Sequence, residues 1–205
     1  STLAEACQRP ENYLGLHFFP PVEEVPLVEI VRGKASSDES VARAFDFVRS
    51  MGKTPIVVKD VWGFYAARVQ NTFILEGIAM LQEGLPPAVI ENLSRQSGMP
   101  RGALELADDL GLEIVLKYEQ LAAAHYGAKY IKHPAVHTLN LMLGDWQRPG
   151  KSLNAGFYSY IGEAEKELWQ HDYAPDHAAG FEEMPETITE RFLFVQVIEA
   201  FWCLQ

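Results

Sequence analysis

Two apolar runs near the N-terminus each contain one ionisable residue, and together these residues could carry out acid–base chemistry. His17 lies in the first run and Glu29 in the second. A carboxylate that accepts the N–H of one imidazole nitrogen fixes the tautomer and leaves the other nitrogen free to take a proton. The same residues could instead be a core histidine with satisfied polar atoms and an inward glutamate paired with a basic side chain. Spacing alone leaves both interpretations open.

The elements that would position this pair lie within residues 14–31. Both runs are rich in aromatic and β-branched residues, which predicts two strands. The connection between them is rich in Pro and Glu, and it is too short for a helical crossover, which needs roughly a dozen residues. We therefore expect antiparallel neighbours, or one strand that turns a corner. Either arrangement could bring His17 and Glu29 within side-chain reach.

Length and charge limit the classes of function. The chain has 205 residues, of which 48% are hydrophobic, so it can bury a core as one domain or two small ones. A net charge of −11 argues against nucleic acid and anionic membranes as general partners, although it leaves room for a local basic pocket. The sequence has no apolar run of about 18 residues, so we expect no membrane span.

The cysteines and the N-terminus indicate the compartment. Cys7 and Cys203 lie at opposite ends of the chain and do not form a disulfide framework. The N-terminus lacks the basic, apolar and small-residue pattern of a secretory signal. A reducing cytosol or an organelle matrix is the expected compartment.

The first 60 residues predict the order helix, strand, strand, helix, strand. Strands that are apolar on both faces need helices on each side, and this stretch supplies too few of them. It therefore has the pattern of the last part of an α/β domain, and we expect the sequence to begin within such a domain. No G-x-G-x-x-G turn follows a strand, so the dinucleotide fingerprint is absent from these residues.

The remaining residues predict a mostly helical structure with short Gly/Pro punctuation. We expect a loop at 148–160 and a polar, acidic linker or extended arm at 161–188. The predicted helices cover 63–82, 86–97, 102–109, 112–126, 134–144 and 189–204. The predicted fold class is thus α+β and mostly α, with the remnant of a Rossmann-type α/β domain followed by an all-α domain.

A series of motifs runs in order along nearly the whole chain. The stretches are 16–21, 26–33, 52–60, 63–68, 98–102, 109–112, 133–134 and 156–158. Several motifs together are more specific than any one of them, and this series resembles the L-3-hydroxyacyl-CoA dehydrogenase family. The last stretch, 191–204, resembles the start of the second helical repeat in the alpha subunit of the multifunctional fatty-acid-oxidation enzyme.

The resemblance implies three parts and one reaction. Residues 1–60 would end an NAD-binding domain, 61–160 would form the helical dehydrogenase C-terminal domain, and 161–205 would hold a linker and the start of a second helical repeat. The family oxidises L-3-hydroxyacyl-CoA to 3-ketoacyl-CoA with NAD in fatty-acid β-oxidation. Its catalytic histidine and glutamate correspond to His17 and Glu29. With most of the NAD site outside these residues, the isolated segment is expected to be inactive.

The resemblance also implies substrate contacts, at positions where this chain departs from the family. Pro20 stands where the family usually has Asn or Ser, and Ala67 replaces a polar residue before Arg68. Arg68 could reach a phosphate or pair with Asp60 or Glu76. Both departures favour the alternative function, a non-catalytic helical dimerisation or assembly module with a degenerate site.

The expected partners follow from the same resemblance. They are an acyl-CoA substrate, a second copy of the chain in a homodimer, and a thiolase subunit in the intact complex, without nucleic acid. His133 and His137 have the i, i+4 spacing of a metal-ligand pair. No third ligand follows at a useful spacing, so we expect no metal, with one histidine acting as a cap and the other on the surface.

Overall fold

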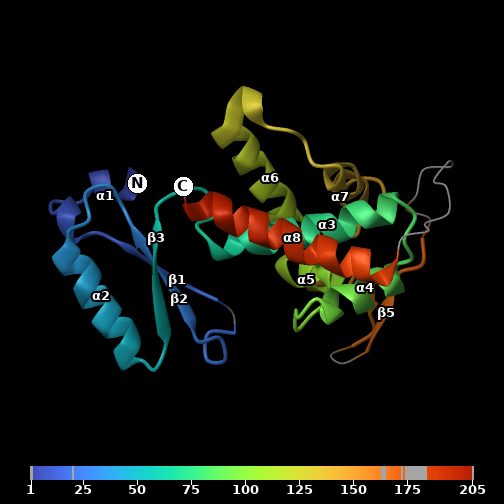
Figure 1. The fold of residues 1–205 in the computed structure, drawn as a ribbon, viewed down its shortest axis with the longest axis horizontal. Coiled ribbons are helices and arrows are strands. Elements are labelled where there is room, and N and C mark those ends of the chain that lie inside the picture. The colour runs from blue at the N-terminus through green and yellow to red at the C-terminus, as the bar shows by residue number, and fades with distance from the viewer. Residues whose placement is uncertain (1, 20, 163–164, 172, 174–183, 205) are drawn as a thin grey trace. The chain divides into compact units, whose positions relative to one another are not determined.

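The computed structural model describes residues 2–19, 21–162, 165–171, 173 and 184–204. The chain divides into two compact units, Ser1–Tyr65 and Ala66–Gln205. The first is a small α/β unit, and the second is helical with one β-hairpin (Figure 1). The predicted fold class, α+β and mostly α, is confirmed. The predicted division at residues 60 and 160 into three domains stays a prediction.

The first unit has the predicted order of elements. β1 pairs antiparallel with β2, and β2 pairs parallel with β3. A short connection suffices for the antiparallel pair, whereas the parallel pair needs the crossover that α2 provides. The elements are α1 (Thr2–Glu5), the 3₁₀ turn η1 (Pro10–Asn12), β1 (Gly15–Phe18), β2 (Leu27–Arg32), α2 (Asp38–Ser50) and β3 (Thr54–Lys59).

Helix α2 covers one face of this sheet. Its buried Ala44 and Val48 pack with Val28 and Ile30 of β2. The helix begins at an N-cap, Ser37, whose Oγ accepts a hydrogen bond from the backbone N–H of Ser40 at 3.1 Å. Because side chains alternate along a strand, the neighbours of Val28 and Ile30 in β2 point to the opposite face.

The second unit is built around helix α3 (Ala66–Gln82), most of whose side chains are buried. A helix that is apolar on nearly all sides needs partners on all sides, and several other helices pack on it. The other elements are α4 (Pro87–Gln96), α5 (Ala103–Leu110), α6 (Leu112–Tyr126), η2 (Gly127–Lys129), α7 (Ala135–Leu143), η3 (Lys151–Leu153), β4 (Tyr158–Tyr160), β5 (Lys166–Leu168) and α8 (Pro185–Leu204).

Helix α8 runs alongside α3 (Figure 1). The rings of Phe73 and Phe192 lie 5.0 Å apart between the two helices, and both side chains are fully buried. At the edge of this apolar contact, Arg191 of α8 donates hydrogen bonds to Glu76 at 2.8 Å and to Glu83 at 2.6 Å. Apolar burial and these charge-assisted bonds therefore hold α8 against α3.

The structure differs from the predicted elements in three places. Helix α3 begins at Ala66 instead of residue 63, because Gly63 and Phe64 have φ angles of 67° and 49° and cannot belong to a right-handed helix. Residues 158–160 and 166–168 form an antiparallel hairpin where a loop and a linker were expected. Helix α8 begins at Pro185, a residue favoured at the first helical position, and its Ile188 is buried.

Part of the predicted linker lies outside the described residues, namely 163–164, 172 and 174–183. Among the helices that are described, none is long and apolar enough to cross a membrane.

Candidate functional site

The two predicted catalytic residues lie directly opposite each other in the first unit. His17 of β1 is the register partner of Glu29 in β2. Residues directly opposite in an antiparallel pair point to the same face, so both side chains leave the sheet together. The Nδ1 atom of His17 lies 2.7 Å from Oε2 of Glu29. The structure therefore contains the histidine–carboxylate pair, which was one of the two interpretations of the sequence.

Burial of the two side chains is unequal. The Glu29 side chain has no exposed surface, whereas 36% of the His17 side chain remains exposed. His17 also lines a cavity of about 300 Å³, together with Tyr13, Gly15 and Phe64. A buried carboxylate can thus act on a histidine that a small molecule can reach.

The second carboxylate oxygen of Glu29 is also hydrogen-bonded. Its Oε1 accepts the backbone N–H of Tyr65 at 3.1 Å. Tyr65 is the last residue of the first unit and follows Gly63 and Phe64. Two separate donors therefore fix the orientation of the carboxylate, one on each oxygen.

The predicted substrate-binding residues have different outcomes. Pro20 lies outside the described residues. Ala67 and Arg68 lie in the first turn of α3, in the second unit, and both are buried. Their role as substrate contacts stays a prediction.

Arg68 takes part in a polar cluster between helices of the second unit. Its Nε donates to Oε1 of Glu199 at 2.6 Å, and its Nη2 donates to the Tyr126 hydroxyl at 3.2 Å. Of the two acids that the sequence suggests as partners of Arg68, Glu76 binds Arg191 instead. No local sequence pattern indicates Glu199 as the partner, because it lies 131 residues from Arg68 in the sequence.

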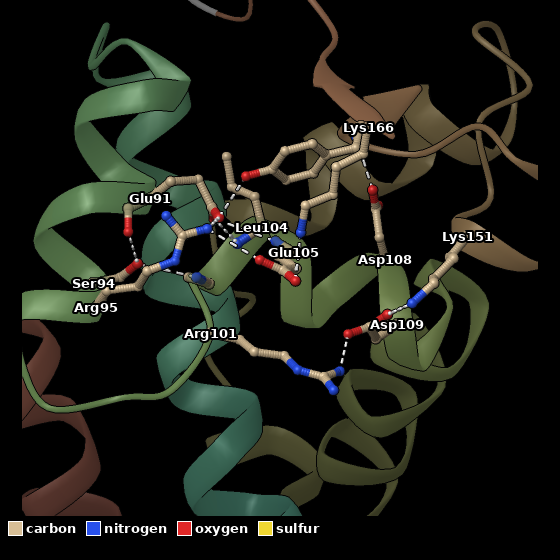
Figure 2. Close-up of polar contacts among 12 residues, drawn as sticks. Glu91, Ser94, Arg95, Arg101, Leu104, Glu105, Asp108, Asp109, Lys151 and Lys166 are labelled. Carbon is tan, nitrogen blue, oxygen red and sulfur yellow. Dashed lines mark hydrogen bonds and ion pairs between the residues drawn. The ribbon is translucent and has the colours of Figure 1, made fainter. Parts of the chain in front are cut away.

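Two further buried carboxylates hold the second unit together, and the first is Glu91 of α4. Figure 2 shows its carboxylate beside the N-terminus of α5, where it accepts the backbone N–H of Leu104 at 2.7 Å and of Glu105 at 3.2 Å. It also accepts the hydroxyl of Tyr158 at 2.7 Å. Glu91 thus caps α5 from another helix, because the N-cap residue itself, Gly102, has no side chain to do so.

A chain of ion pairs extends from this carboxylate. Arg95 lies between Glu91 and Glu105, at 3.1 Å and 3.0 Å (Figure 2). Lys166 reaches Glu105 from β5 at 2.5 Å. Burial alone would raise the pKa of Glu105, but the hydrogen bonds from Lys166 and Arg95 outweigh it and lower that pKa. This network connects the β-hairpin to α4 and α5.

The second buried carboxylate is Asp108 of α5. It accepts the backbone N–H groups of Phe157 and Tyr158, each at 2.8 Å, and the Tyr160 hydroxyl at 3.1 Å. Burial raises its pKa to about 6, although these hydrogen bonds act in the opposite direction. Its neighbour Asp109 binds Lys151 at 2.7 Å and also Arg101 (Figure 2). Asp108 and Asp109 therefore both have structural roles.

The histidine pair considered for metal has another arrangement. Nδ1 of His133 accepts the backbone N–H of Ala135 at 3.3 Å, so His133 caps the start of α7, and burial lowers its pKa. His137 is exposed. Across the described part of the chain, no three His, Cys, Asp or Glu side chains gather in a way that could hold a metal ion.

Two protein-family domains match this chain, one after the other. The NAD binding domain of 3-hydroxyacyl-CoA dehydrogenase matches residues 1–61, and the C-terminal domain of the same enzyme matches residues 63–160. One class of dehydrogenase has this domain arrangement, in which the helical domain follows an α/β unit with a histidine–glutamate pair. The chain belongs to the 3-hydroxyacyl-CoA dehydrogenase family.

The related sequences are parts of much longer proteins. The fatty acid oxidation complex subunit alpha of Shewanella loihica is 33% identical over 205 residues, which cover 99% of this chain and 28% of the relative. The subunit of the same name from Vibrio vulnificus is 38% identical over 161 residues, 78% of this chain and 22% of the relative. The chain therefore spans about a quarter of the length of these curated relatives.

Solved structures show the same fold. The (S)-3-hydroxybutyryl-CoA dehydrogenase of Ralstonia eutropha matches with a TM-score of 0.71 and 30% identity, covering 78% of this chain and 56% of that one. The dehydrogenase part of multifunctional enzyme 1 from C. elegans matches with a TM-score of 0.67 over 98% of this chain and 46% of that one. At 22% identity, the second match supports the fold alone.

Proposed function

We propose that this chain carries the proton-accepting dyad and the helical domain of an NAD-dependent L-3-hydroxyacyl-CoA dehydrogenase of fatty-acid β-oxidation. The observation that supports it is the 2.7 Å contact between Nδ1 of His17 and Oε2 of the buried Glu29. A carboxylate only accepts hydrogen bonds, so Nδ1 carries the hydrogen and Nε2 carries the lone pair. Nε2 is then the atom that takes the proton of the substrate 3-hydroxyl.

Glu29 has two functions in this scheme. It holds the imidazole in the tautomer that can accept a proton, and its negative charge stabilises the imidazolium that forms. Because Glu29 has no exposed surface, water does not screen this charge, and its effect on the histidine is larger than on the surface. A positioned general base of this kind contributes about 10²–10⁴ in rate.

The cofactor named by the family is NAD, whose nicotinamide supplies hydride acceptance when bound. No G-x-G-x-x-G turn occurs among the 15 glycines, so the fingerprint that holds a dinucleotide pyrophosphate is absent from this sequence. The His17–Glu29 pair fits the proton-transfer half of the reaction.

The proposal extends to partners. The name of the relatives, subunits of a fatty acid oxidation complex, supports assembly with other chains, and the family resemblance points to a thiolase subunit, a homodimer and an acyl-CoA substrate in a bacterial cytoplasm. Light scattering of the 205-residue protein at about 100 µM, well above common dimer dissociation constants, tests the homodimer. A monomer at that concentration would contradict it.

A chimera tests the activity. Residues 1–160 replace the aligned part of the Shewanella loihica alpha subunit, and NADH formation is measured with 3-hydroxyacyl-CoA of several chain lengths. We expect activity that His17→Gln lowers by about 10²–10⁴. The matched control is His137→Gln, which changes an exposed histidine of α7. A folded chimera that is inactive at every chain length would instead support the non-catalytic assembly module.

A further inference from the structure

The turn that leads out of the first unit has an unusual backbone. Gly63 has a φ of 67° and Phe64 a φ of 49°. The left-handed region is open to glycine, but it is disfavoured for an aromatic residue with a Cβ atom. Such conformations persist only where the surrounding structure imposes them, and they cluster at functional sites.

The first consequence of this turn concerns Glu29. The left-handed residue reverses the chain just before α3, and the next backbone N–H, that of Tyr65, points at Oε1 of Glu29 at 3.1 Å. A right-handed Phe64 would extend the helix backward and turn this N–H into an early helical donor. The backbone of Phe64 therefore decides whether the Tyr65 N–H reaches Oε1 of Glu29.

The second consequence concerns the imidazole. The Phe64 ring lies 5.7 Å from the His17 ring, at an angle of 57°. Phe19 provides another contact, at 4.6 Å and 59°. Two tilted aromatic neighbours limit the rotamers of the imidazole, and Phe64 also lines the cavity that His17 borders.

We propose that Phe64 is a positioning residue for the His17–Glu29 dyad, through its left-handed backbone and through its ring. The backbone presents the Tyr65 N–H to Glu29. The ring restrains the His17 imidazole, whose Nδ1–H donates a hydrogen bond to the same carboxylate. The inference rests on the proposed function, because the dyad is the proton acceptor only in that reaction.

NMR on the 205-residue protein tests the two parts separately. The readouts are the downfield Nδ1–H proton of ¹⁵N-labelled His17 and the hydrogen exchange of the Tyr65 amide. Phe64→Gly keeps the left-handed backbone and removes the ring. Phe64→Val keeps an apolar side chain whose β-branching disfavours that backbone. The control, Phe47→Ala, removes an aromatic ring from α2 that is 54% exposed.

The proposal makes a distinct prediction for each variant. In Phe64→Gly the Tyr65 amide stays protected, within about threefold, while the His17 Nδ1–H exchanges about tenfold faster or more. In Phe64→Val the Tyr65 amide loses about tenfold or more of its protection, and the His17 signal is lost as well. Phe47→Ala leaves both readouts unchanged. The amide of Ile30, a buried residue of the central strand β2, reports whether the first unit is folded in each variant.

Two results would overturn the proposal. One is that Phe64→Val, or Phe64→Gly if the first does not fold, leaves both signals as in the parent. The other is that Phe47→Ala changes them as strongly as the Phe64 variants. In the chimera, Phe64→Gly should lower kcat by about tenfold with KM within about twofold, since it acts on the chemical step.

These results are separable from those of the proposed function. An inactive chimera whose NMR pattern is as expected would refute the dehydrogenase and leave the geometry of the dyad intact. An active chimera that depends on His17, combined with unchanged NMR signals in the Phe64 variants, would refute the positioning role alone.

Discussion

The carboxylate of Asp108 occupies the space that a Cβ atom on Gly156 would need. The close approach allows the backbone N–H groups of Phe157 and Tyr158 to reach Asp108. A side chain at position 156 would push the β4 segment away and leave a buried carboxylate without its donors. The glycine and the aspartate are therefore one structural unit, which fixes the hairpin to α5.

The first prediction is that Gly156→Ala destabilises the protein by at least about 2 kcal/mol, through overpacking and lost hydrogen bonds. Urea unfolding followed by circular dichroism measures it. Gly33→Ala is the control, because its Cβ would meet only the Ser36 Oγ at 3.4 Å, an ordinary contact. Equal midpoints for Gly156→Ala and the parent would contradict the expected clash.

The second prediction concerns pH. Burial raises the pKa of Asp108 from 3.8 to about 6, so between these values the unfolded chain has released a proton that the native protein still holds. The stabilising contribution of Asp108 is thus complete below about pH 4 and falls as pH rises to about 6, by up to about 3 kcal/mol.

Unfolding measured from about pH 4 to pH 7, for the parent and for Asp108→Asn, tests this sign. We expect the variant to be less stable throughout, because the NH₂ of an amide cannot accept the backbone N–H that one of the two Asp108 oxygens accepts. Its disadvantage should be largest at the acid end and shrink towards pH 6. A disadvantage that grows with pH would show that the pKa of Asp108 is lowered instead.

The third prediction concerns Glu91. Replacing it with alanine leaves the N–H groups of Leu104 and Glu105 and the Tyr158 hydroxyl without an acceptor, and Arg95 without one of its acids. Loss of one partner from a buried charged network costs about 3–5 kcal/mol.

The control for this change is Glu190→Ala, which removes an exposed carboxylate from α8 and should alter stability by no more than about 0.5 kcal/mol. Thermal or urea unfolding compares the two variants. If Glu91→Ala unfolds at the same midpoint as Glu190→Ala, the cap on α5 is not a stabilising feature.

Local patterns predicted the part of the site that depends on local geometry. The connection between β1 and β2 is short, so antiparallel pairing was one of the two arrangements expected, and this pairing places His17 opposite Glu29. Helical periodicity predicted α6 closely, because this helix has one continuous apolar pattern and ends just before a glycine. For these elements, sequence and tertiary packing favour the same structure.

Features that depend on distant contacts were missed. Phe64 is neither Gly nor Asn, so nothing at its position indicates a left-handed backbone. The hairpin of β4 and β5 is held by contacts to Asp108 and Glu105, about 50 to 60 residues earlier in the chain. The partners of Arg68 were missed for the same reason.

The fourth prediction concerns the 205-residue protein alone. It should oxidise NADH with acetoacetyl-CoA no faster than buffer does, because its sequence has a dyad but no G-x-G-x-x-G turn to hold the dinucleotide pyrophosphate. Absorbance of NADH over time measures it, and the unmodified Shewanella loihica alpha subunit is the positive control. Turnover by the 205 residues would show that they bind NAD by other means.

The last prediction separates the charge of Glu29 from its shape. In the chimera, Glu29→Gln keeps the volume of the buried side chain, but its one oxygen can accept either the Tyr65 N–H or the His17 Nδ1–H, and the negative charge that stabilises the His17 imidazolium is lost. We expect kcat to fall by about 10² or more, with KM nearly unchanged, because the charge matters only once the proton has moved. Glu24→Gln, an exposed carboxylate between β1 and β2, should leave both constants unaltered. A rise in KM alone would mean that Glu29 acts on substrate binding instead of on proton transfer.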